Sequence, residues 1–452
     1  MLRSTRVFFW FLRSSIQRYW KRYLLIVCIL ASIGGFLFQN PLKMKRSINI
    51  GVVGSTTEKT LPREITKKIS RSLMTLSPGG IPTKDIVEQW EVSEDGKSYT
   101  FHIQRGLFWH DGRPVYADNI ASVFTESHVE VLDSYTIRFS LTEPFSPFLA
   151  TIATKPILQG LSGFGPYRVS GVSHNGENIE TLILEDETKK LVVHFYPNQQ
   201  SGQTALKLGE IQLFGTTLPM TFNWENIEVT NVPSSKRALT LFFRMTHPLL
   251  GSKAELRAAL GAAAPRLPAV DGQLRPIGPI APTSWAYSEP TKKFAENLEF
   301  AKQLLSDLEL PEGDHAFTLT TTGAFEQEAK DISAVWETLG FQVKVDIQPT
   351  IPEEFDVLLT DLDIPETPDQ YMLWHSTRAT NITKYKSERI DKLLEDGRMV
   401  LDIDAQKKIY ADFQRYFIDD APAYMLSYLP YTIYHSKKIS PEEAKELLQD
   451  AY

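Results

Sequence analysis

Alternating apolar and polar residues predict two strands in the first third of the chain. Residues 99–104 read Y-T-F-H-I-Q, so Tyr99, Phe101 and Ile103 would face a core while the residues between them face solvent. Residues 134–141 repeat this pattern. Because side chains alternate between the two faces of a sheet, a period of two indicates strands that are buried on one face.

Apolar residues spaced three and four apart predict helices elsewhere. We expect them over residues 56–76, 255–264, 294–308 and 325–339, and further along around residues 390–394 and 409–417. Short apolar or alternating runs predict strands at residues 47–54, 239–245, 317–321, 341–347 and 355–359. The regular order of strand and helix in the second half favours an α/β fold, with a mixed or parallel sheet covered by helices.

Turn-forming residues divide the stretch from 90 to 120, which reads W-E-V-S-E-D-G-K-S-Y-T-F-H-I-Q-R-G-L-F-W-H-D-G-R-P-V-Y-A-D-N-I. Its two Asp-Gly pairs predict tight turns between strands. Asp118 is expected to cap a helix that continues to residue 124. Residues 163–168 read G-F-G-P-Y-R, another turn, in which the glycines are expected to allow a positive φ.

The stretch from 90 to 120 resembles the signature of solute-binding protein family 5, the peptide-binding class of bacterial ABC-transporter receptors. The family pattern is roughly W-x-V-S-x-D-G-x-x-Y-T-F-x-L-R-x-G-V-x-F-H-D-G-x-P-x-x-A-x-D-V. Three later stretches are similar to further family motifs: residues 163–167, 256–263 (L-R-A-A-L-G-A-A) and 301–305 (A-K-Q-L-L). The resemblance therefore covers nearly all of the chain after residue 46.

The resemblance implies a two-lobe periplasmic binding protein-like fold (class II, cluster C type) with a subdomain inserted in the first lobe. Mapped on this chain, lobe I would comprise residues 47–75, 161–245 and 423–452, the inserted subdomain residues 76–160, and lobe II residues 246–422. The signature reads as turns, strands and a helix start. We therefore expect it to build the inserted subdomain and to touch little ligand.

The first 46 residues differ sharply from the rest. They hold nine basic residues and no acid, and residues 23–38 form an uncharged apolar run. The run and its basic flank predict an uncleaved membrane anchor, with the N-terminus in the cytoplasm and the body outside. A cleaved signal peptide and a buried soluble helix are the alternatives. Because the whole chain has a net charge of −7, the remainder carries −16, which argues against nucleic-acid binding.

The sequence offers no catalytic or metal-binding motif. The nine histidines are scattered without H-x-x-x-H spacing, and no G-x-S-x-G, P-loop or G-x-G-x-x-G motif occurs. Cys28 is the only cysteine, so the body has neither a disulfide nor a thiol nucleophile. We expect a protein that is not an enzyme and that needs no cofactor and no metal.

The resemblance implies a function as well: a receptor on the periplasmic side of the inner membrane that binds short peptides between its lobes and delivers them to an ABC permease. A monomer is expected. In the family, an Asp within D-Y-x-D-P-D-N-F meets the peptide amine. The nearest equivalent here is Asp363, with Asp361 second, and Trp374 and His375 would line the cleft.

This recognition segment departs from the family pattern. Thr367 stands where the family has the Asp before Pro, and the spacing is off by one residue. The ligand therefore stays open between peptides and a non-peptide solute such as a nickel chelate, haem, glutathione or a sugar. A scaffold or sensor that has kept the fold and lost transport is a third hypothesis.

Overall fold

The computed structural model describes Trp20 and residues 45–124, 128–218, 220, 224–289, 297–310 and 315–451. The chain divides into two units, one of residues 1–47 and 187–190 and one of residues 48–186 and 191–452, and the second contains all but the first two residues of two strands among the features below. Within the described residues, no helix is both long enough and apolar enough to span a bilayer. The predicted anchor, residues 23–38, lies outside the described residues.

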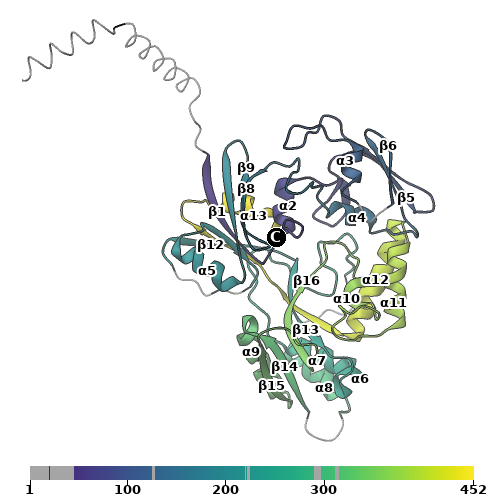
Figure 1. The fold of residues 1–452 in the computed structure, drawn as a ribbon. Helices are drawn as coiled ribbons and strands as arrows, with labels where there is room; N and C mark the ends of the chain where they lie inside the picture. Colours follow the sequence, from purple (N-terminus) through teal and green to yellow (C-terminus); the bar gives the residue numbers. More distant parts are fainter. Residues whose placement is uncertain are drawn as a thin grey trace, which may run out of the picture. The chain divides into compact units, whose positions relative to one another are not determined.

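The first large sheet has seven strands, and we call the part of the chain built on it lobe I (Figure 1). Its strands, in spatial order, are β12 (Ile227–Val232), β18 (Tyr431–Ser436), β11 (Leu213–Thr216), β1 (Arg46–Val53), β10 (Lys189–Tyr196), β9 (Asn178–Glu185) and β8 (Arg168–Asn175). Strands β1 and β11 are parallel, and Ile50 pairs with Leu213.

Three helices accompany this sheet: α2 (Arg63–Ile69), α5 (Gln199–Leu208) and α13 (Pro441–Leu448), followed by the 3-10 turn η2 (Gln449–Ala451). Ile65 of α2 and Leu447 of α13 share a buried cluster with Ile50 of β1. Leu206 of α5 packs in a second cluster with Phe214 of β11. Helices α2 and α13 thus pack against the strands, and η2 lies next to α2.

The second large sheet has five strands, and we call its part of the chain lobe II. The strand order is β15 (Gln342–Gln348), β14 (Ala316–Thr322), β16 (Val357–Asp363), β13 (Arg237–Phe243) and β17 (Ala423–Tyr428). Its helices are α6 (Pro248–Ser252), α7 (Ala254–Ala263), α8 (Leu298–Ser306), α9 (Glu326–Thr338), α10 (Tyr371–Trp374), α11 (Glu388–Met399) and α12 (Ile403–Asp420), with the 3-10 turn η1 (Gly323–Phe325).

The central strands β13 and β16 of lobe II are buried on both faces. In β13, Leu241 packs in one core with α7, α8 and α9, whereas the next residue, Phe242, packs in the other with α10, α11 and α12. Strand β16 repeats this division with Leu359 and Leu358. Full burial explains why these strands read as continuous apolar runs in the sequence. The predicted helix–strand order of this half is confirmed, and Gly340 ends α9 at a φ of 94°.

A smaller sheet contains the signature stretch, and we call residues 74–157 the small-sheet segment. Its strands are β4 (Val87–Val92), β5 (Ser98–Ile103), β7 (Thr136–Ser140) and β6 (His128–Asp133), joined by the pair β2 (Met74–Leu76) and β3 (Pro82–Lys84) and the helices α3 (Ala117–Ala121) and α4 (Phe148–Ala153). Tyr99, Phe101 and Ile103 are buried as predicted, and Trp109 belongs to the same core.

Two helix predictions are wrong in their bounds. Helix α3 begins at Ala117 and ends at Ala121, so Asp118 lies inside it; Tyr116 holds the N-cap position, where its backbone N–H donates to the Asn119 side chain. The helix predicted over residues 56–76 is only α2, seven residues long. It stops because the backbone N–H groups of Gly165 and Tyr167 donate to the carbonyls of Ile69 and Lys68, at 2.8 and 2.9 Å.

The turn at residues 163–168 needs glycine for a different reason from the one predicted. Neither Gly163 nor Gly165 has a positive φ. A side chain at Gly165 would place its Cβ only 2.7 Å from the carbonyl carbon of Ile69 and the nitrogen of Ser70. Close approach of two backbones therefore selects glycine here, and this approach attaches the turn to the end of α2.

Sheet membership does not follow the predicted lobe boundaries. Strands β13 and β17 fall in residues assigned to lobe I from sequence, yet both pair within the five-stranded sheet. Only β18 returns to the seven-stranded sheet, where it pairs with β11 and β12. The chain thus passes between the sheets just before β13 and just after β17. The physical reason is that β13 pairs on either side with β16 and β17.

Candidate ligand-binding cleft

A cavity of about 890 Å³ lies between elements of lobe I and the end of β16. Residues of β1, α2, β11 and η2 line one side, and residues around Lys236 and Glu366 line the other. An adjoining cavity of about 610 Å³ shares Arg63, Lys236 and Glu366 with it. Both volumes fall in the range of roughly 300–1,000 Å³ that is typical of small-ligand sites. We call the two cavities together the cleft.

Glu366 stands at the centre of the cleft with a cation on each carboxylate oxygen. Arg63 Nη1 of α2 lies 3.0 Å from Oε2, and Lys236 Nζ lies 3.2 Å from Oε1. Glu366 follows β16, which ends at Asp363, by three residues. The ion pair joins lobe I to the segment after β16, and all three side chains remain about one third exposed or less.

The electrostatics of Glu366 favour its charged form. Burial raises the pKa of this carboxyl, but Arg63 and Lys236 outweigh burial and hold the pKa below its ordinary value of 4.5. At neutral pH the cleft therefore contains a carboxylate whose charge is shared by two cations.

Arg63 retains a donor that no protein group uses. Its Nε is buried from solvent and makes no hydrogen bond within the described residues, although Nη1 is bonded to Glu366. The residue nevertheless lines both cavities, and a guanidinium can bind a carboxylate or carbonyl oxygen of a ligand. A second charged group lies close by, where Lys67 and Lys68 each approach Asp450 to 3.6 Å. Burial lowers the pKa of Lys68.

The two predicted ligand carboxylates lie at the edge of the cleft and share one partner. Arg237 Nε is 2.6 Å from Asp363 Oδ1, and Arg237 Nη1 is 3.0 Å from Asp361 Oδ2. Asp363 lines the larger cavity with a side chain that is 77% exposed, and Asp361 does not line it. Contact between Asp363 and a ligand amine stays a prediction, and the structure adds that Arg237 already neutralises this carboxylate.

Trp374 and His375 lie in the core of lobe II, and neither lines a cavity of the cleft. The Trp374 ring is 2% exposed, packs against Phe242 and Phe417, and donates from Nε1 to Gln370. His375 is 4% exposed and stacks on Tyr371. The cleft wall expected from these two residues is therefore not formed by them. Trp374 at the end of α10 packs on Phe417 of α12, and His375, the next residue, lies 3.3 Å from Glu395 of α11.

Sequence reasoning missed Arg63, Lys236 and Glu366. Glu366 did leave a signal, because it is the carboxylate directly before Thr367, the position at which the family Asp was expected. Arg63 and Lys236 left none, since each lies far from that segment in sequence. Only the fold brings the three together. Among the described residues, no group of three or more His, Cys, Asp or Glu side chains is placed to hold a metal ion.

The profile of the bacterial extracellular solute-binding proteins, family 5 Middle, matches residues 82–127 and 120–384. The chain belongs to this family. The dipeptide-binding protein of Escherichia coli K12 is 21% identical, in an alignment that covers 76% of this chain and 80% of the relative. The match confirms the resemblance drawn from the signature stretch, and with it a solute-binding protein of the family 5 type.

Solved structures of similar fold agree. NikZ from Campylobacter jejuni, in complex with Ni(L-His), superimposes with a TM-score of 0.69 at 18% identity and covers 88% of this chain and 95% of NikZ. AppA from Bacillus subtilis, in complex with a nonapeptide, gives a TM-score of 0.65 at 18% identity over 90% of this family 5 member and 99% of AppA. The two-lobe α/β fold of periplasmic binding proteins is thereby established.

The ion pairs of Glu366 predict a pH dependence of stability. Because the pKa of Glu366 is depressed in the folded protein, its contribution is present above pH 4.5 and is lost as the pH falls through the folded value. Urea unfolding of the wild type and Glu366→Gln from neutral to acidic pH measures this contribution. The wild type should be the more stable at neutral pH, and the difference should shrink below pH 4.5. A difference that grows on acidification contradicts the assignment.

Proposed function

We propose that this protein is an extracytoplasmic receptor that binds short peptides in the cleft and delivers them to an ABC permease. One observation carries the proposal. A single cavity holds a carboxylate, Glu366, between two cations, Arg63 and Lys236. A peptide carries an ammonium at one end and a carboxylate at the other, and a cavity with both signs of charge can satisfy both.

We propose that Glu366 receives the ammonium of the peptide. A ligand ammonium beside its carboxylate would compete with Lys236, the more mobile and more strongly hydrated of its two partners. The guanidinium of Arg63, which lines both cavities of the cleft, would then donate to a peptide carbonyl or to the terminal carboxylate. Asp363, which shares its partner Arg237 with Asp361, is the second candidate for binding the ammonium. Closure of the two lobes would bury the ligand.

The organisation of the chain completes the proposal. We infer that residues 74–157 form a subdomain inserted into lobe I, as in the class II, cluster C type, and that the lobe boundaries fall before β13 and after β17. Residues 23–38 would anchor the protein in the inner membrane, with a monomeric body in the periplasm. A tether of this kind keeps the receptor close to its permease and raises the effective concentration. No catalytic step on the ligand is proposed.

Native mass spectrometry tests the proposal. The full chain, purified in detergent, is incubated with equimolar pools of di- to pentapeptides and with nickel–histidine. We expect one or more peptides to be retained, and the retained peptides to raise the melting temperature with concentration, as binding to the folded state requires. Retention of nickel–histidine with no peptide bound from any pool would show that the peptide assignment is wrong.

Comparison of two variants shows which of the two candidate carboxylates binds the peptide ammonium. Glu366→Gln and Asp363→Asn each remove one charge and preserve the size of the side chain. If Glu366 receives the ammonium, only Glu366→Gln should weaken the retained peptide strongly. The reverse result would move the role to Asp363.

A further inference from the structure

A third cavity, separate from the cleft, lies where the small-sheet segment meets lobe II. Its volume is about 240 Å³. One wall comes from Pro147 and Ala150 at the start of α4, and another from Ile403 and Tyr410 of α12. Trp285 and the segment from Thr367 to Asp369 complete it. We call it the α4–α12 cavity.

The lining of the α4–α12 cavity is mainly apolar, and three of its apolar side chains are exposed to solvent at the rim. Ile81, Leu401 and Ile403 line it and are nevertheless 42%, 41% and 42% exposed. Inside, the rings of Trp285 and Tyr410 meet edge to face at a centroid distance of 6.2 Å. Isolated exposed apolar side chains are ordinary on a protein surface, but a group of them around an apolar hollow marks an interaction site.

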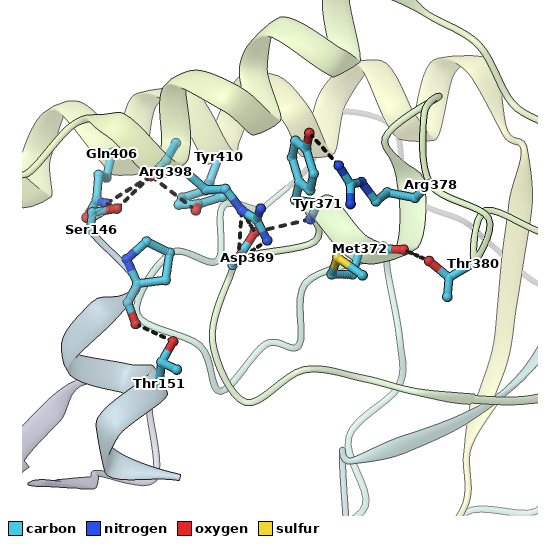
Figure 2. A network of polar contacts seen from close by, with 12 residues as sticks. Ser146, Thr151, Asp369, Tyr371, Met372, Arg378, Thr380, Arg398, Gln406 and Tyr410 are labelled. Carbon is cyan, nitrogen blue, oxygen red and sulfur yellow. Dashed lines mark hydrogen bonds and ion pairs between the residues drawn. The ribbon is translucent and has the colours of Figure 1, made fainter. Parts of the chain in front are cut away.

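The polar groups in the wall are already satisfied by the protein. Gln406 Nε2 donates to Ser146 Oγ at 2.6 Å, and Ser146 Oγ donates to the carbonyl of Gly397 at 2.9 Å. Arg398 binds Asp369 through Nε and Nη2, at 2.8–3.0 Å. Figure 2 shows these contacts, in which Ser146, just before α4, meets Gln406 of α12, and Asp369, just before α10, meets Arg398 of α11. Because these polar atoms already bond to one another, they leave few hydrogen-bond donors or acceptors for a ligand. An occupant would therefore gain affinity mainly from apolar contact.

The size and position of the α4–α12 cavity restrict the kinds of ligand that can occupy it. An apolar cavity of about 150 Å³ is large enough for benzene, so the α4–α12 cavity suits a group of roughly aromatic side-chain size and is too small for a whole peptide. Gly80 lines this cavity at a φ of 79°, and its backbone lies directly against the carbonyl of Glu366, a residue that lines the cleft. Trp285 N donates to the carbonyl of Gly79 at 3.0 Å and holds the same turn.

We propose that the α4–α12 cavity binds an apolar group of side-chain size, with a preference for an aromatic ring. The ring can belong to a peptide whose backbone lies in the cleft and which displaces the turn at Gly80, or to a free aromatic compound that enters past Ile81 and Ile403. The first source rests on the proposed function, and the second does not. Either occupant touches both α4 and α12, so its binding favours the arrangement in which the small-sheet segment contacts lobe II.

A charge at the rim tests the proposal. Ile403→Glu places a carboxylate at the mouth of the cavity, and Ile347→Glu, on β15 at the same 42% exposure and away from the cavity, is the matched control. Calorimetry with the full-length protein measures affinity for indole, for trialanine and for Ala-Phe-Ala and Ala-Ala-Phe. In the wild type, we expect indole binding, or an aromatic tripeptide that binds about tenfold or more tightly than trialanine, as apolar pockets discriminate.

The variants then decide. Loss of indole binding, or of the aromatic preference, in Ile403→Glu with retention in Ile347→Glu supports the cavity. Indole that binds beside saturating trialanine identifies a free compound as the source, and an aromatic preference identifies a peptide side chain. Trialanine binding without indole binding or any aromatic preference overturns this inference and upholds the proposed function. Indole binding that is lost in Ile403→Glu, with no tripeptide bound by the wild type, supports the cavity and overturns the proposed function.

Discussion

Glu366→Ala is expected to weaken peptide binding by roughly 2–5 kcal/mol, at least about thirtyfold in the dissociation constant, as truncation of one partner in a buried charge pair does. The substitution removes the acceptor for the ligand ammonium. It also leaves Arg63 and Lys236 in the cleft without their shared carboxylate, 3.0 and 3.2 Å from where its oxygens lie. Two uncompensated cations would repel an ammonium, so the loss should exceed that of a single hydrogen bond.

Isothermal titration with a peptide retained in the mass-spectrometric screen measures this change. Glu354→Ala is the control, because Glu354 also binds an arginine, Arg244, at 2.6 Å but is 82% exposed and lines neither cavity of the cleft. Its peptide affinity should match the wild type. An unchanged affinity in Glu366→Ala, with correct folding, would remove Glu366 from the ligand site and would favour Asp363.

Arg257→Met is expected to lower the free energy of unfolding by about 3–5 kcal/mol, because it removes a charged donor from several carbonyls at once. Arg257 of α7 is 2% exposed. It donates to the carbonyls of Leu250 and Gly251 within α6, and to those of Asp420 and Ala421 at the end of α12. Burial lowers the pKa of Arg257 to about 10, so the guanidinium is still charged at neutral pH.

Urea unfolding monitored by tryptophan fluorescence measures the loss in Arg257→Met. The control is Arg415→Met on α12, where the arginine pairs with Asp412 and both side chains are about half exposed. A surface pair of this kind contributes little, and the control should lie within about 0.5 kcal/mol of the wild type. A loss in Arg257→Met no greater than in the control would mean that water replaces the guanidinium at these carbonyls.

The wrong C-terminal bound of α2 has a cause that is distant in sequence. Apolar spacing at residues 65, 69, 73 and 76 fits a helix, but the turn at Gly165 takes the carbonyl of Ile69 and ends α2 there. Likewise, periodicity does not reveal that β13 pairs with β16 and β17 in lobe II. Local pattern specifies the type of an element, whereas its end and its partners depend on segments that are distant in sequence.

The residues of the candidate site were even harder to predict from local pattern than the ends of the helices. The sequence drew attention to the segment from Asp361 to His375, and the fold does place part of it, Asp363 to Glu366, along the cleft. Asp363 was chosen because it lay nearest to a family motif. It faces Arg237, and Glu366 is the carboxylate held between cations from two other parts of the chain. Trp374 and His375 follow closely in sequence but turn into the core.

By itself, the sequence determined the family, the α/β class, most strands and helices, and the burial of the signature strand at Tyr99, Phe101 and Ile103. These properties follow from local spacing and from motifs read in order, which need no knowledge of distant partners. The tertiary structure alone decided the cleft around Glu366, the burial of Trp374, the role of Arg257 and the α4–α12 cavity. Each depends on contacts between segments far apart in the chain, and the charge or polarity of a residue does not disclose which partner it will meet.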